Sequence, residues 1–170
     1  WGALVSFMLA VSPSSELPGM LFWLMGDMAH ARNPAVPMAI LLVVVLAAVP
    51  FGRTLNILAR GRQQAAALGV AVRRIEWLLH LAAALLAATA VTVAGSIGFV
   101  GLIVPHLLRL IIGNDQRVLL PASALAGGIL LVLADTLART LIAPEQLPVG
   151  VITALLGVPA FLYLLHRSPA

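Results

Sequence analysis

Apolar residues in this chain form long runs that are separated by short polar segments. Five runs contain few charged side chains: 36–49, 75–94, 97–112, 118–138 and 149–165. A helix needs about 20 mostly apolar residues to cross the hydrocarbon core of a bilayer. In lipid, only a helix or a closed barrel satisfies all of its backbone polar groups. The pattern therefore predicts an all-α, polytopic membrane protein with about five spanning helices.

Two shorter apolar segments precede these runs. Residues 1–11 are too few to span a bilayer, and we expect them to be the last turns of a truncated helix. Residues 17–25, with the sequence LPGMLFWLM, include Phe22 and Trp23. Aromatic rings concentrate where water meets lipid, so this segment is expected to be a short helix at the membrane boundary.

Composition excludes a soluble domain. Of the 170 residues, 62% are hydrophobic and 9% are charged, whereas soluble domains are about half apolar and about a quarter charged. The net charge of +4 is the balance of ten basic residues, all of them arginines, and six acidic residues. These arginines lie mainly between the apolar runs, where orientation signals of membrane proteins occur, which argues against nucleic acid as a partner.

The arginines are divided unequally between the two sides of the predicted membrane. If the runs cross in alternation, then 53–74, 113–117 and 166–170 share one side. Eight of the ten arginines lie on or near that side, while only Arg32 and Arg139 lie on the other. Arginine-rich connections remain in the cytoplasm, so the first side is predicted to be cytoplasmic.

The longest polar segment is 53–74, with the sequence RTLNILARGRQQAAALGVAVRR. It contains five arginines and no acidic residue. Its composition predicts a short helix over 63–68, a stop at Gly69 and a second short helical piece. From the residues alone, two interpretations stay open: a docking surface for a cytoplasmic partner, or a solvated basic loop that only sets orientation.

The third run contains the sequence GSIGFVGLIVPH, which combines small residues, a helix breaker and a titratable ring. The regular spacing of Gly95, Gly98 and Gly101 on a helix favours the close approach of a neighbouring helix. Pro105 removes a backbone donor and predicts a kink. His106 is then either part of a moving hinge that lines a path or bonded to a neighbour in a packed kink. A single histidine without partners at ligand spacing does not predict a metal site.

Two further patterns lie near the C-terminal end. In LPVGVITALLGVP, Gly157 and Pro159 repeat the combination of small residue and proline and predict a close-packed, bendable helix. Asp135 and Arg139 are four residues apart, which predicts either a local ion pair or a contact for an acidic external partner. The sequence shows no phosphate loop, no paired carboxylates and no nucleophile with a base, so an enzyme is disfavoured.

Three stretches closely resemble the FecCD-type permease family: GSIGFVGLIVPHLLRLIIGNDQRVLLPASALAGG, LADTLARTLIAPEQLPVGVITALLGVPAFLYLL and LNILARGRQQAAALGVAVRR. These are the membrane subunits of ABC importers for iron–siderophore complexes, haem and cobalamin. The resemblance extends from about Leu21 to His166. Because family members have ten spans, the chain is similar to their second half, and 1–170 is expected to be one transmembrane permease domain that includes a cytoplasmic coupling loop at 53–74.

The resemblance also implies partners and a location. They are a cytoplasmic ATP-binding subunit that hydrolyses ATP, an external or periplasmic substrate-binding protein, and a second permease copy. The location is the bacterial cytoplasmic (inner) membrane, and no cofactor is implied.

The resemblance assigns roles to particular residues. Residues that match the family's ATPase-coupling helices are Arg60, Arg62, Gln63, Ala66, Leu68, Gly69, Arg73 and Arg74. Arg139 matches an arginine that meets a glutamate of the binding protein. The segment around Pro105 and His106 is structural in the family, which favours the packed kink.

Two other classes remain as alternatives, a secondary transporter and a non-transporting membrane scaffold. A secondary transporter is expected to place ionisable groups near the middle of the membrane. The runs 36–49, 118–138 and 149–165 have none at their centres. No residue type in the sequence identifies the cargo.

Overall fold

The computed structural model describes residues 1–29 and 33–167, and within this part all regular structure is helical. Arg32, one of the two arginines assigned to the outer side, lies outside the described residues. The helices are α1 (Gly2–Val11), α2 (Leu17–Met25), α3 (Ala35–Leu58), α4 (Arg62–Ala67), α5 (Val72–Ala94), α6 (Val100–Ile112), α7 (Gln116–Thr140) and α8 (Val149–Arg167).

Three of the described helices, α3, α5 and α7, are long and apolar enough to cross a membrane. The apolar helix α6 and the apolar part of α8 are shorter than these three. Large apolar side chains remain exposed along the helices, for example Leu81 on α5 and Leu125 on α7. Helices that are apolar on all sides face lipid or other protein segments. The chain is therefore a multi-pass membrane protein.

Helix α3 is longer than its apolar run predicts. The apolar run ends at residue 49, and Pro50 directly after it predicts the end of the span, but the helix continues to Leu58. Proline removes one backbone hydrogen bond, yet proline inside a transmembrane helix is tolerated where neighbouring groups compensate. Arg53 therefore belongs to a spanning helix, and the connection to α5 begins at residue 59 instead of 53.

The second half of that connection also differs from the expectation. The second short piece predicted after Gly69 is the first turn of α5, which begins at Val72 and continues without a break to Ala94. Arg73 and Arg74 therefore lie on α5. By contrast, the predicted bounds of the boundary helix α2, 17–25, agree with the structure.

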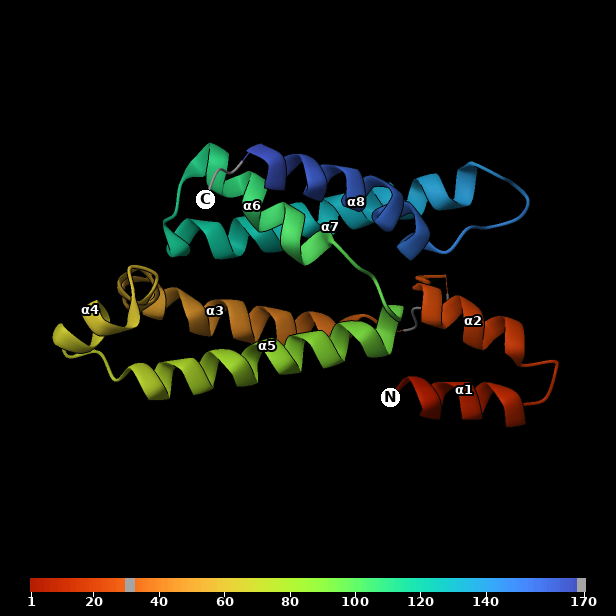
Figure 1. Ribbon diagram of the computed structural model, residues 1–170, viewed down its shortest axis with the longest axis horizontal. Coiled ribbons are helices and arrows are strands. Elements are labelled where there is room, and N and C mark those ends of the chain that lie inside the picture. The colour runs from red at the N-terminus through yellow and green to blue at the C-terminus, as the bar shows by residue number, and fades with distance from the viewer. Residues whose placement is uncertain (30–32, 168–170) are drawn as a thin grey trace.

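The helices form two groups that lie side by side (Figure 1). In one group, α6, α7 and α8 pack against one another. In the other, α3 and α5 form a hairpin whose tip is α4. The tip, the 113–115 turn and the C-terminal end of α8 lie at one end of the molecule, as alternating crossings require, whereas α2 lies toward the other end (Figure 1).

Few side chains are buried, and the main cluster lies where α7 meets the start of α8. Its buried members are Ala134, Ala138, Val149 and Ile152, with Met28, Ile97 and Leu147 packed against them. Small residues at this contact allow the two backbones to approach closely, which is the usual means of helix association in membranes.

At the same end, three glycines join α2, α5 and α8 through their backbones. The Asp27 N–H donates to the Ala94 carbonyl at 3.0 Å, and the Gly150 N–H donates to the Gly26 carbonyl at 3.2 Å. A Cβ on Gly95 would collide with the Trp23 carbonyl, and one on Gly150 would collide with the Met25 carbonyl. The C-terminal end of α2 is thus fixed to the helices that follow it.

Candidate functional site

The connection between α3 and α5, predicted to be cytoplasmic, contains one short helix, α4. It begins after Gly61 and ends at Ala67, close to the predicted helix over 63–68. Its C-terminal end is closed by two backbone hydrogen bonds, from the Gly69 N–H to the Ala66 carbonyl and from the Val70 N–H to the Ala65 carbonyl, each 3.0 Å. Gly69 has φ +78°, a conformation that glycine adopts without strain. The predicted stop at Gly69 is confirmed.

Contacts with both flanking helices, α3 and α5, hold α4 in place. Ala65 is completely buried, and α4 packs against both α3 and α5. The Arg62 guanidinium forms an ion pair with the Glu76 carboxylate on α5. These contacts fix the position of α4 relative to the two spanning helices that flank it.

The remaining residues assigned to coupling lie on the surface of this tip or, for Arg73 and Arg74, on the first turn of α5 beside it. All of them are exposed: Arg60, Gln63, Ala66, Leu68, Gly69, Arg73 and Arg74. Leu68 exposes 69% of its surface. The exposed surface therefore combines an apolar side chain, Leu68, with arginines around it. A face of this kind suits a partner that offers an apolar cleft with acidic groups beside it.

A hydrogen-bonded bridge connects the base of the hairpin to α7. The Asn56 Nδ2 group, near the end of α3, donates to Asp115 Oδ1 at 2.8 Å. The Asn56 Oδ1 atom accepts from the Gln116 backbone N–H at 2.8 Å. Asp115 is also the N-cap of α7 and accepts from the Arg117 N–H at 3.0 Å. One amide side chain thus bridges the α7 N-cap, Asp115, and the first-turn N–H of Gln116.

The same contacts stabilise the ionised form of Asp115. The hydrogen bond from the Asn56 side chain is the main reason that the pKa of Asp115 lies below its ordinary value. The Arg117 backbone N–H lowers the pKa further. Asp115 therefore stays a carboxylate, an acceptor for both donors, throughout the neutral range.

At the opposite end of α7, Arg139 is paired within its own helix. Its Nε donates to Asp135 Oδ2 at 2.7 Å. The predicted i,i+4 ion pair is confirmed, and about two fifths of the Arg139 side chain remains exposed, at 41%. The guanidinium therefore keeps donors available to a partner on this side, although Asp135 offsets part of its charge.

The glycines of GSIGFVGLIVPH are arranged differently from the expectation. Gly95 and Gly98 lie in the non-helical stretch between α5 and α6, and only Gly101 is helical, so the prediction that all three share one helix is wrong. A Cβ on Gly98 or Gly101 would have no neighbour within 4 Å. These two glycines therefore do not mediate a close helix contact. The close contact in this region is at Gly95, against the Trp23 carbonyl.

Helix α6 continues without interruption through Pro105 to Ile112. Within the described residues, the half-buried ring of His106 makes no hydrogen bond, so the expected bond to a neighbour is not found.

The second glycine–proline pattern meets the first one in space. A Cβ on Gly157 would collide with the Phe99 side chain at the start of α6, so the glycine provides the space in which this ring lies. Pro159 lies inside the continuous helix α8. The contact explains why an apolar helix carries a glycine at position 157.

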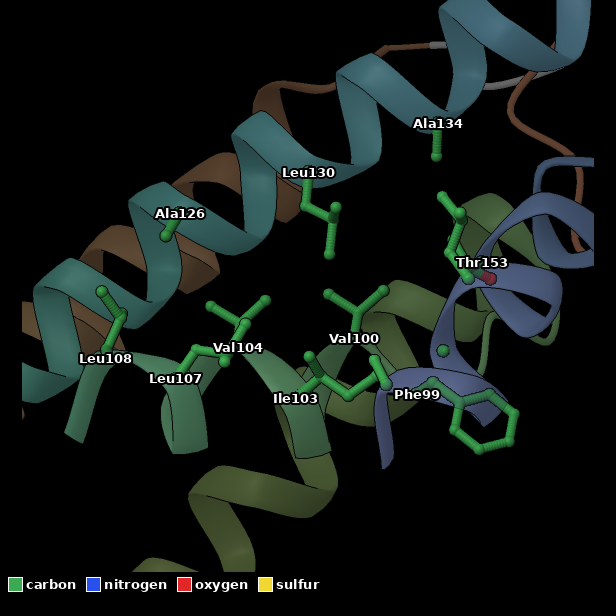
Figure 2. A pocket seen from close by; sticks show the side chains of 13 residues that line it. Phe99, Val100, Ile103, Val104, Leu107, Leu108, Ala126, Leu130, Ala134 and Thr153 are labelled. Carbon is green, nitrogen blue, oxygen red and sulfur yellow. The ribbon is translucent and has the colours of Figure 1, made fainter. Parts of the chain in front are cut away.

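A cavity of about 350 Å³ separates parts of α6, α7 and α8 (Figure 2). Val100 and Val104 from α6 face it, as do Leu130 from α7 and Thr153 from α8 (Figure 2). The Thr153 hydroxyl donates to the Gly150 carbonyl at 3.0 Å. The lining is otherwise apolar and provides no group for a charged substrate. Across residues 1–29 and 33–167, no group of three or more His, Cys, Asp or Glu side chains is placed to hold a metal ion.

Comparison with known proteins gives one consistent answer. A model of the FecCD transport family matches residues 1–167. The chain belongs to the FecCD transport family. It is 49% identical to the cobalamin import system permease protein BtuC of Halobacterium salinarum, over 97% of this chain and 44% of that protein. It is 44% identical to the hemin transport system permease protein HmuU of Yersinia pestis, over 98% of this chain and 51% of that protein.

A solved structure, an inward-facing putative metal-chelate type ABC transporter, is also similar. The TM-score is 0.85 at 34% identity, covering 98% of this chain and 55% of that chain. The FecCD chain thus spans about half the length of the curated relatives that it matches.

Sequence reasoning missed three residues of this FecCD chain: Glu76, Asn56 and Asp115. Each acts across elements, with a separation of 14 residues for Arg62–Glu76 and 59 for Asn56–Asp115. One signal for Glu76 was present, because it is the first acidic residue after the acid-free stretch 53–74. Asn56 has no comparable signal, since a single polar residue in a basic segment is normally solvated.

Proposed function

We propose that this chain is the C-terminal half of the permease subunit of an ABC importer that moves cobalamin, hemin or a related metal chelate across the cytoplasmic membrane. Membership of the FecCD family and the names of the relatives support this proposal. Iron–siderophore complexes belong to the same chelate class. The chain performs no hydrolysis itself, and ATP is hydrolysed by a separate cytoplasmic subunit.

The observation on which the proposal depends is the form of the hairpin tip. A basic helix, α4, is fixed by buried Ala65 and the Arg62–Glu76 ion pair, while Leu68 and Ala66 face outward. Such a tip moves together with α3 and α5 when a partner pulls on it. We assign it as the coupling site, through which closure of the ATPase subunits drives alternating access.

Other partners follow from the two ends of the molecule. The Arg139 end faces the outside and contacts the substrate-binding protein, and a second permease copy completes the translocation path. The whole of 1–170 then acts as one membrane domain, with the coupling helix on its cytoplasmic side. The membrane is the cytoplasmic membrane of a prokaryote, since the relatives include archaeal and bacterial proteins.

Ala66→Asp tests the coupling site. Ala66 is exposed, so the substitution leaves α4 folded but places a carboxylate in the proposed interface. An unpaired charge buried at an interface costs several kcal/mol, and we expect ATP-driven uptake to fall by about tenfold or more. The measurement is uptake of cyanocobalamin or hemin by the full-length permease reconstituted in vesicles with its ATPase and binding protein.

The matched control is Ala66→Ser, which adds a small polar group without charge and should transport normally. Normal uptake and normal ATPase stimulation by Ala66→Asp would remove α4 from the ATPase interface.

Arg139→Glu tests the outer contact. The substitution places a third acidic group near Asp135 and Glu145, and it repels an acidic partner. Exposed charge interactions are worth about 1 kcal/mol each, so the Kd for the binding protein should rise by about 5- to 10-fold at low ionic strength. Asp135→Asn, which releases Arg139 from its ion pair, should bind at least as well as the unmodified protein. An unchanged Kd for Arg139→Glu, measured by titration in nanodiscs, would contradict the assignment.

A further inference from the structure

The hairpin that includes α4 is joined to the α6–α8 group mainly through one helix contact. Among the described residues, the substantial packing between the two groups is that of α3 against α7 (Figure 1). Helix α7 also packs against α6 and α8. At the end of the hairpin nearest α4, a displacement of α4 therefore reaches α7 through α3, whereas the glycine contacts that join α5 to α2 and α8 lie at the opposite end.

At the cytoplasmic end, this contact is made by polar groups in a fixed geometry. Asn56 donates to the Asp115 carboxylate and accepts from the Gln116 N–H, both at 2.8 Å. Because one acceptor is ionised, the first bond is stronger than a bond between neutral groups. Two bonds from one planar amide also fix the relative orientation of the helix ends.

One turn earlier on α3, the two helices touch without any gap. Gly52 is buried, and a Cβ at this position would collide with Cγ of Arg117. The α3 backbone thus lies directly against the first turn of α7, next to the Asn56 bridge. A polar bridge and a close backbone contact together prevent α3 from sliding along α7 at this end.

We propose that Asn56 is a positioning residue that transmits displacement of the coupling helix to α7. Asn56 lies two residues before the end of α3, and α4 begins at Arg62, after the connection 59–61. Helix α7 begins at the other partner of the bridge and continues unbroken to Thr140, so it connects the bridge to Arg139 at the outer side. Without the bridge, α3 can slide along α7, so a displacement of α4 no longer moves α7 by the same amount.

This inference rests on the proposed function, and its test separates the two. Asn56→Asp removes the amide donor and places a second carboxylate against Asp115. In the reconstituted full-length transporter we expect the number of substrate molecules moved per ATP to fall by about 5- to 10-fold, at the lower end of typical coupling effects. ATPase activity itself should continue. The substrate is cyanocobalamin or hemin, whichever the unmodified transporter moves.

The double variant Asn56→Asp with Asp115→Asn exchanges the two side chains and is the rescue test. An amide at position 115 donates to the carboxylate at 56, which still accepts from the Gln116 N–H, so coupling should return to near the unmodified value. Asn114→Asp is the matched control, because it adds the same charge beside Asp115 but outside the bridge. Asn56→Ser, which adds no charge and is too short to bridge, replaces Asn56→Asp if that variant is not recovered folded.

Each outcome decides the matter. Impaired coupling in Asn56→Asp, restored by the exchange and absent in Asn114→Asp, supports transmission through the bridge. Normal coupling in Asn56→Asp or Asn56→Ser, or an impairment that the exchange does not restore, overturns it. If Ala66→Asp uncouples transport from ATP hydrolysis while Asn56→Asp does not, the coupling site is supported and only the proposed role of Asn56 is overturned. If Ala66→Asp also transports normally, the proposed coupling site fails.

Discussion

At the scale of single residues, glycines of one motif have different structural roles. Gly95 has φ +68° and ψ −155°, a region open almost only to glycine, and a Cβ at this position would collide with the Trp23 carbonyl. Gly98, three residues later, has open space where a Cβ would lie. The sequence presents both as members of one regular repeat, and only the tertiary contact distinguishes them.

Gly95→Ala is therefore expected to destabilise the protein, whereas Gly98→Ala is not. The backbone strain alone costs about 1–3 kcal/mol, and the collision with Trp23 adds to it because the contact atom belongs to backbone. Thermal unfolding of the purified full-length protein in detergent measures the difference. Gly98→Ala, the matched control, should stay within about 0.5 kcal/mol of the unmodified protein. Equal unfolding temperatures for the two variants would contradict a structural role of Gly95 in the contact formed by Gly26, Gly95 and Gly150.

The two described ion pairs show which contacts can be predicted from the separation of residues along the sequence. Asp135 and Arg139 lie on adjacent turns of one helix, so their contact follows from a separation of four residues. Arg62 and Glu76 lie on different helices, and their contact exists only because α4 folds back onto α5. Sequence reasoning therefore identified the first pair and missed the second.

At the scale of elements, the helix boundary predicted at Pro50 was wrong, whereas the predicted bounds of α2 were correct. The predicted and observed bounds of α2 agree because Glu16 and Gly26 flank a short apolar segment. The sequence predicts that a span ends at Pro50, yet α3 continues through it, as α7 does through Pro121 and α8 through Pro159. In lipid there is no water to compensate an opened helix, so a continuous helix is favoured even at the loss of one hydrogen bond.

This correction matters for the proposed function, because it changes the structure of the proposed coupling segment. A flexible loop over 53–74 would leave α4 free to move independently of the membrane helices. With α3 continuous to Leu58 and α5 continuous from Val72, α4 is the tip of a stiff hairpin. The basic residues of that segment then divide into those on the tip, such as Arg60, and those on the spanning helices, such as Arg53 and Arg73.

At the scale of the whole molecule, the two ends differ in charge and in contacts. The end with α4 has most of the arginines and the polar bridge at Asn56 and Asp115. The end with α2 is joined by backbone contacts of small residues, Gly26, Gly95 and Gly150. The all-helical class and the alternation of the helices were predicted from apolar runs, whereas the joints at both ends depend on contacts between distant residues.

The orientation of this asymmetric molecule can be tested directly, because these 170 residues contain no cysteine. Leu68 at the coupling tip and Ile142 in the connection after α7 are both exposed, so a cysteine at either position should react with a maleimide. Eight arginines at the α4 end predict that this end is cytoplasmic. In spheroplasts that express the full-length protein with its other cysteines replaced, a membrane-impermeant maleimide should label Ile142→Cys. It should label Leu68→Cys only after permeabilisation. The reverse pattern would place α4 outside the cell, where no ATPase can reach it, and would overturn both the coupling site and the bridge that depends on it.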